Sequence, residues 1–169
     1  MTWFKPQHFI GARPLRRRLA YPRNVAPPPF QVLSGIKPWG GLWTSTWRPE
    51  GGTEWTEWCQ AEHFGTPYAK AWLLWPSKSA RVAVIDRLED LGGLIQAFPG
   101  PTWGGRSGID FEAAALELDG IHLTSEGQWA TRLTQPNLYG WDCESTLWLR
   151  WVFDRTERAP DLQRPRPEA

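Results

Sequence analysis

Apolar and polar residues alternate along several short stretches of the chain, a pattern that is typical of β-strands. The alternation predicts strands at residues 7–11, 30–33, 42–46, 69–75, 81–85, 119–124 and 145–153. Apolar residues spaced three and four positions apart predict short helices at residues 54–64, 87–98, 109–118 and 125–133. Because the two kinds of element do not alternate regularly, we expect a single α+β domain with a mostly antiparallel or mixed sheet.

Two segments lack such a pattern. Residues 12–29 are rich in arginine and proline, and since proline fixes φ and removes a backbone donor, we expect an extended crossing segment there. Residues 154–169 are expected to form a flexible C-terminal tail, which leaves residues 1–153 as the domain. The chain has no long apolar run and no apolar segment behind its N-terminal charges, so neither a membrane span nor a secretory signal is expected.

Tryptophan is unusually frequent, with 13 copies among 169 residues. An indole buries a large area but keeps an N–H group that needs a partner, so this composition predicts either a mixed core or an aromatic-lined groove. Cys59 and Cys143 lack the spacing of metal ligands. A disulfide between them is one alternative, and reduced thiols in a cytoplasmic protein are the simpler one.

A net charge of +1 conceals an uneven distribution of charge along the chain. The first 49 residues carry +8 and the remainder −7, and the basic residues of the first segment are Lys5, Arg13, Arg16, Arg17, Arg18, Arg23, Lys37 and Arg48. Such a basic segment suits a phosphate-bearing partner, and we expect any nucleic-acid contact to run through Arg13, Arg16, Arg17, Arg18 and Arg23. The alternative is that the segment packs on the acidic remainder of the chain.

Common catalytic motifs are absent from the chain: it has no GxGxxG after a strand, no P-loop and no GxSxG sequence. Cys59 and His63 lie four residues apart on a predicted helix, but no third ligand accompanies them, so no metal site is expected. His122 is expected to be an exposed or hydrogen-bonded residue in the middle of a strand.

The last predicted strand begins with an unexpected charge. Side chains alternate between the two faces of a strand, so Leu147, Leu149, Trp151 and Phe153 share a core face while Glu144 lies on the opposite face. Glu144 is then near the start of the strand, where a sheet opens toward a cleft. The alternative is a solvated sheet face on which Glu144 pairs diagonally with Arg150.

Four segments together carry a resemblance: residues 37–45 (KPWGGLWTS), 55–64 (WTEWCQAEHF), 118–124 (LDGIHLT) and 139–151 (YGWDCESTLWLRW). They resemble a group of small uncharacterised bacterial and phage proteins with a KPxGLWxS, WxxWC, DGI and GWD pattern. Their order is also similar, more distantly, to that of the ADP-ribosyltransferase motifs. Residues 41–45 look like the second motif of that family, Glu144 looks like the third, and His8 or Arg13 could fill the first. Trp43 stands where tyrosine is usual, and residue 142 is Asp, so no E-x-E pair exists.

The ADP-ribosyltransferase resemblance implies a split sheet and an enzyme that uses NAD to modify a protein or a nucleic acid. It implies that Glu144 is the catalytic residue and that the NAD-binding residues are His8, Arg13, Trp43, Thr44 and Ser45. A carboxylate at this position would stabilise the positive charge that develops on the ribose when its bond to nicotinamide breaks. Two other hypotheses stay open: a non-enzymatic module that binds nucleic acid or a host protein, and an accessory phage protein without a site.

Overall fold

Seven strands form one mixed sheet in the parts of the chain that the computed structural model describes, residues 5–10, 15–25, 37–64, 71–102 and 108–160. The strands are β1 (Gln7–Ile10), β2 (Leu42–Thr46), β3 (Ala71–Pro76), β4 (Val82–Ile85), β5 (Gly120–Leu123), β6 (Ser145–Trp148) and β7 (Phe153–Arg158). Their order across the sheet is β4–β5–β6–β2–β1–β3–β7. All pairs are antiparallel except β4 with β5, which confirms the expected α+β class with a mixed sheet.

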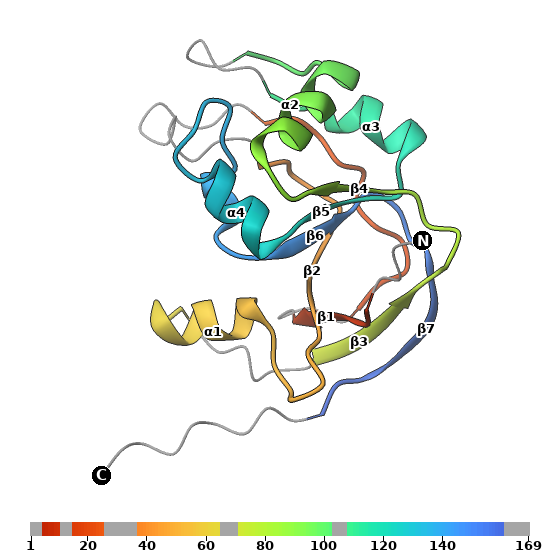
Figure 1. The fold of residues 1–169 in the computed structure, drawn as a ribbon. Coiled ribbons are helices and arrows are strands. Elements are labelled where there is room, and N and C mark those ends of the chain that lie inside the picture. Colours follow the sequence, from red (N-terminus) through yellow and green to blue (C-terminus); the bar gives the residue numbers. More distant parts are fainter. Residues whose placement is uncertain (1–4, 11–14, 26–36, 65–70, 103–107, 161–169) are drawn as a thin grey trace.

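Four α-helices and a 3₁₀ helix complete the described fold: α1 (Glu54–Ala61), α2 (Leu88–Ala97), α3 (Phe111–Glu117), α4 (Ser125–Thr131) and η2 (Tyr139–Trp141). Figure 1 shows α2, α3 and α4 gathered over β4, β5 and β6, whereas α1 lies apart beside β2. In three of these helices, the side-chain oxygen of the N-cap residue accepts a backbone N–H group of the first turn. Thr53 caps α1, Asp110 caps α3 and Thr124 caps α4.

An apolar cluster packs against each face of the sheet around its central strands. One cluster joins the sheet to α2 and α3 and includes Leu147, while the other lies on the opposite face and includes Trp148. All four residues of β6 are therefore buried. The sequence pattern predicted that only one face of this strand is buried. The second face is buried as well, because side chains of β3 and β7, among them Phe153, pack in the same cluster as Trp148.

The expected C-terminal tail is wrong for residues 154–158, which belong to β7; residues 155–158 pair with β3 from Trp75 to Trp72. The predicted strand 145–153 is also divided, because β6 ends at Trp148 and the chain bends before β7 begins. Side chains on β7 are mostly charged and exposed, so the strand shows no apolar alternation. Backbone pairing and the Arg155 guanidinium, 3.7 Å from the centre of the Trp75 ring, hold it instead.

Cys59 and Cys143 are buried free thiols. The strand predicted at 30–33 lies outside the described residues, as does Arg13. Among the described helices, none combines the length and the apolarity that a membrane crossing requires.

Two helical glycines give a matched test of the packing of α4 on the sheet. A Cβ atom added at Gly127 would lie 2.0 Å from the backbone carbonyl oxygen of Ile85, whereas one at Gly92 in α2 would meet nothing within 4 Å. We expect Gly127→Ala to lower the free energy of unfolding by about 1–3 kcal/mol and Gly92→Ala to raise it by roughly 0.5–1 kcal/mol. Urea unfolding measures both. Equal effects of the two substitutions would contradict the close contact of α4 with β4.

Candidate functional site

Strand β2 pairs with different neighbours along its two halves. Residues 42–44 pair with β6, and residues 45–46 pair with β1 on the other edge. Beyond Thr44, the β6-facing edge of β2 therefore has no ladder partner in these pairings. Glu144, which directly precedes β6, lies at this opening.

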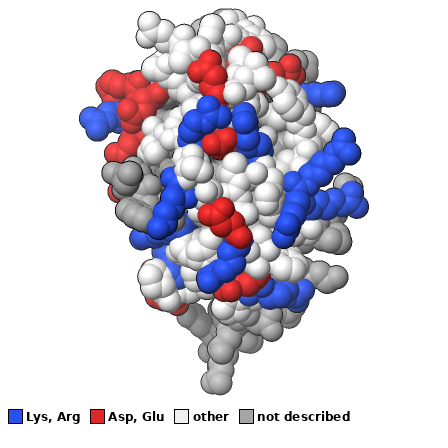
Figure 2. Space-filling model, turned by 90° about the vertical axis from the view of Figure 1, so that its right-hand side faces the viewer, with Lys and Arg blue, Asp and Glu red and all other residues white. Residues whose placement is uncertain are grey.

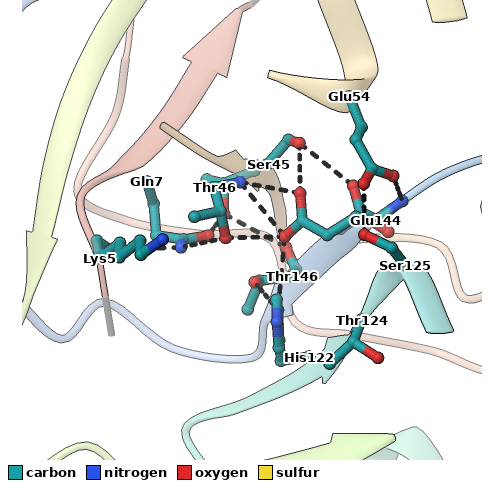
Figure 3. Close-up of polar contacts among 12 residues, drawn as sticks. Lys5, Gln7, Ser45, Thr46, Glu54, His122, Thr124, Ser125, Glu144 and Thr146 are labelled. Carbon is teal, nitrogen blue, oxygen red and sulfur yellow. Dashed lines mark hydrogen bonds and ion pairs between the residues drawn. The ribbon is translucent and has the colours of Figure 1, made fainter. Parts of the chain in front are cut away.

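At that edge, the carboxylate of Glu144 accepts the hydrogen bonds that a neighbouring strand would otherwise accept (Figure 3). The backbone N–H of Thr46 donates to its two oxygens at 3.0 and 3.2 Å. The hydroxyl of Ser45 donates to Oε2 at 2.6 Å, and the hydroxyl of Thr46 donates to Oε1 at 2.8 Å. Only 6% of the residue is exposed, so these charge-assisted hydrogen bonds fix the carboxylate in one orientation. The expected meeting of Glu144 with the 43–45 strand is thus present at Ser45.

Arg150 takes no part in this arrangement. Its guanidinium Nε lies 3.2 Å from Asp119 Oδ1, and its Nη2 donates to the carbonyl oxygen of Ala115. The alternative in which Glu144 pairs with Arg150 on a solvated sheet face is therefore wrong, because both faces of β6 are buried and the carboxylate points to β2.

Two further residues surround Glu144 that the sequence did not single out for this role. His122 Nδ1 lies 3.6 Å from Glu144 Oε1 and 2.8 Å from the hydroxyl of Thr146. Burial lowers the pKa of His122, although the nearby carboxylates of Glu144, Asp86 and Glu54 oppose this effect. Glu54 accepts the backbone N–H of Glu144 at 3.0 Å and the hydroxyl of Ser125. In the sequence, Glu54 is recognisable only as an acidic residue in the first turn of a predicted helix. Such residues are common because they interact favourably with the helix dipole, so this position did not mark Glu54 as part of a site.

A smaller pocket of about 360 Å³ opens in front of Glu144. Its walls come from α1, α4, β2, β5 and the N-terminal segment, and the lining residues include Lys5, Arg48, Glu54, His122, Ser125, Glu126 and Glu144. Within the described parts of the chain, no group of three or more His, Cys, Asp or Glu side chains could hold a metal ion.

A larger pocket of about 500 Å³ lies where β1 and β2 part. Residues 8–10 of β1 and residues 41–45 line it, together with Trp55, Trp141 and the side chains of Arg16, Arg18 and Lys37. The candidate cofactor residues His8, Trp43, Thr44 and Ser45 therefore share one pocket. Ser45 connects it to Glu144, which lines the smaller pocket.

His8 is the unusual residue of the larger pocket. It lies opposite Ser45 in the β1–β2 ladder and is only 2% exposed. Neither ring nitrogen has a hydrogen-bond partner among the described residues. Burial lowers the pKa of His8 to about 4, so the imidazole is neutral at physiological pH and presents one donor and one acceptor.

Trp43 and Thr44 differ in what they offer to the larger pocket. The Trp43 ring packs edge-on against Trp141, with ring centres 4.6 Å apart, and the Lys37 ammonium lies 5.2 Å from the Trp43 ring centre. The hydroxyl of Thr44 donates to Gln7 Oε1 and accepts from Trp148 Nε1, both at 2.8 Å. Thr44 is therefore a buried part of the wall whose hydroxyl is already engaged.

On the face that includes the β7 side of the molecule, the described Lys and Arg side chains are interspersed with Asp and Glu (Figure 2). Lys37 pairs with Asp142 at 3.4 Å, and Arg48 pairs with Glu57. Part of the basic N-terminal segment thus does contact the acidic remainder. Arg16, Arg17, Arg18 and Arg23 are exposed, and Arg17 lies 5.9 Å from the Trp151 ring centre.

The neutral, buried His8 predicts a pH dependence of stability. The pKa of His8 falls from 6.5 to about 4 on folding. Between these two pH values, the imidazole is therefore protonated in the unfolded chain but remains neutral in the folded protein. Stability should therefore decline as the pH falls from 6.5 toward 4, by about 3 kcal/mol at most. Urea unfolding at pH 7.5 and 4.5 should show a decline that is smaller by roughly 2–3 kcal/mol in His8→Gln.

Exposed His63 provides the control for that measurement. His63→Asn should lose as much stability between the two pH values as the wild type does. A His8→Gln variant that also matches the wild type would show that His8 is not buried in its neutral form.

No protein-family model, curated protein or solved structure matches this chain. What the site can do is therefore inferred from its own chemistry. Its main elements are a buried carboxylate fixed by Ser45 and Thr46, a larger aromatic pocket in which His8 has no hydrogen-bond partner among the described residues, and a smaller polar pocket beside Glu54 and His122.

Proposed function

We propose that the protein is an ADP-ribosyltransferase-like enzyme that cleaves NAD at its nicotinamide–ribose bond. The ADP-ribosyl group would pass to a macromolecular acceptor, either a protein or a nucleic acid. The observation that carries this proposal is the carboxylate of Glu144, held by Ser45 and Thr46 at the boundary between two pockets. NAD is the substrate here, and Glu144 is the proposed catalytic residue.

The reaction requires stabilisation of positive charge more than proton transfer. As the C1′–N bond of NAD breaks, its electron pair moves to the nicotinamide ring, which leaves as a neutral molecule, and positive charge develops on the ribose. A carboxylate beside the ribose stabilises that charge, as in glycoside cleavage. An acceptor oxygen or nitrogen then bonds to C1′ and loses its proton.

The environment of Glu144 suits this electrostatic role. Hydrogen bonds from Ser45 and Thr46 already orient the carboxylate, so no reorganisation is needed as the charge develops. The residue is almost fully buried, and the interaction of two charges is stronger away from bulk water. His122, whose pKa is lowered by burial, would be largely neutral at pH 7 and would not cancel the negative charge.

The larger pocket supports the choice of a nucleotide substrate. Its volume of about 500 Å³ falls within the range of small-molecule sites. Trp43 and Trp55, which are only partly buried, offer aromatic surface for a planar ring, and Arg16 and Arg18 offer positive charge for phosphates. The residues expected to bind NAD and lying in the described chain, His8, Trp43, Thr44 and Ser45, all line this pocket.

The test is release of nicotinamide from NAD by the purified protein, followed by chromatography. Glu144→Gln removes the charge at nearly constant size, and we expect kcat to fall by roughly 10²–10³-fold because one preorganised electrostatic contact is lost. Circular dichroism should show an unchanged fold. The exposed Glu117 on α3 provides a matched control, and Glu117→Gln should retain full activity.

Two results would contradict the proposal. One is wild-type protein that releases no nicotinamide with or without added protein and nucleic-acid acceptors, which would favour a non-enzymatic binding module. The other is a folded Glu144→Gln variant that is as active as the wild type.

A further inference from the structure

The described residues that line the two pockets beside Glu144 carry opposite net charges. Among them, three basic side chains line the larger pocket, Arg16, Arg18 and Lys37, and one carboxylate, Asp142, pairs with Lys37. Three carboxylates line the smaller pocket, Glu54, Glu126 and Glu144, together with two basic side chains, Lys5 and Arg48. Since burial keeps His8 and His122 largely neutral, the formal charges are +2 and −1.

NAD carries the same asymmetry. Its pyrophosphate is doubly negative, and its nicotinamide ring is positive until the bond to ribose breaks. A cationic ring is repelled by Arg16, Arg18 and Lys37 in the larger pocket, whereas a diphosphate is attracted to them. The charges of the two pockets therefore favour the orientation of NAD in which the diphosphate lies in the larger pocket and the nicotinamide ring lies in the smaller one.

The unpartnered imidazole of His8 indicates that the larger pocket accommodates a ligand with polar groups. Buried polar nitrogens are nearly always hydrogen-bonded in folded proteins, and here both ring nitrogens lack a partner among the described residues. A neutral imidazole can donate to one ligand atom and accept from another. A nucleoside supplies both kinds of atom in its ribose hydroxyls and ring nitrogens.

Aromatic side chains provide the remaining requirement of a nucleoside site. Three indoles line the larger pocket: Trp43, Trp55 and Trp141. Trp43 and Trp55 are only partly buried, which leaves ring surface accessible to a base. Stacking on such surfaces is favourable for any base.

We infer that the larger pocket binds a nucleoside diphosphate and that the nicotinamide ring of NAD points into the smaller, acidic pocket. The ribose between them then lies at Glu144, which borders the smaller pocket and bonds to Ser45 of the larger one. The orientation of NAD rests on the proposed function. The nucleoside diphosphate site does not, because ADP alone tests it.

Calorimetry with ADP and with NAD separates the two claims. We expect ADP to bind the wild type, and Arg18→Gln and His8→Leu each to weaken ADP binding by about tenfold, since each removes a polar contact. Arg23→Gln is the control, because Arg23 belongs to the same basic segment, is exposed and does not line the pocket. This control should bind ADP as the wild type does.

A substitution in the smaller pocket tests the orientation. Glu126→Gln should weaken NAD binding severalfold, measured in the Glu144→Gln background so that NAD stays intact, and should leave ADP affinity unchanged. Arg18→Gln should weaken the binding of both ligands. If Glu126→Gln weakens ADP binding while Arg18→Gln leaves ADP binding unchanged, the orientation is reversed and the inference is overturned.

The remaining outcomes distinguish this inference from the proposed function. Release of nicotinamide by a protein that does not bind ADP would overturn the nucleoside diphosphate site and leave the proposed enzyme intact. ADP binding that depends on His8 and Arg18, in a protein that never cleaves NAD, would support the site and contradict the proposed enzyme.

Discussion

A buried carboxylate must be hydrogen-bonded, and the way in which this fold satisfies Glu144 determines the geometry around it. The donors come from β2, which extends past the end of its ladder with β6 and offers the N–H of Thr46 and the hydroxyls of Ser45 and Thr46. The backbone N–H of Glu144 is in turn accepted by Glu54 at the start of α1. One residue, through its side chain and its backbone, thus joins the ends of three elements, and neither a shorter β2 nor an earlier start of β6 would preserve the arrangement.

The same division of β2 creates the two pockets. On one edge β2 leaves β1 and opens the larger, aromatic pocket, and on the other it leaves β6 and opens the smaller, polar one. Glu144 lines the smaller pocket and accepts a hydrogen bond from Ser45 of the larger one, so under the proposed function the reacting ribose of a substrate that occupies both lies at the carboxylate. This is the physical basis for proposing that a bond between two differently charged parts of a substrate is broken here, and NAD is a substrate with such parts.

The alternation of apolar and polar residues was sufficient to predict the elements that follow such a pattern. It predicted β1 to β6 closely enough to place Glu144 before a late strand and Ser45 on an early one. It could not predict β7, because the exposed strand is held by backbone pairing and by stacking of Arg155 on Trp75 rather than by apolar alternation. It also missed Glu54 and the burial of both faces of β6, since both arise from contacts distant in sequence. That His8 has no hydrogen-bond partner among the described residues is equally a property of the folded chain.

A structure of the Glu144→Gln protein crystallised with saturating NAD tests the central claim most directly. The account predicts that the nicotinamide ribose lies beside residue 144, with C1′ in van der Waals contact with its side chain and the rest of NAD divided between the two pockets. NAD bound elsewhere, or both pockets empty at saturation, would contradict it.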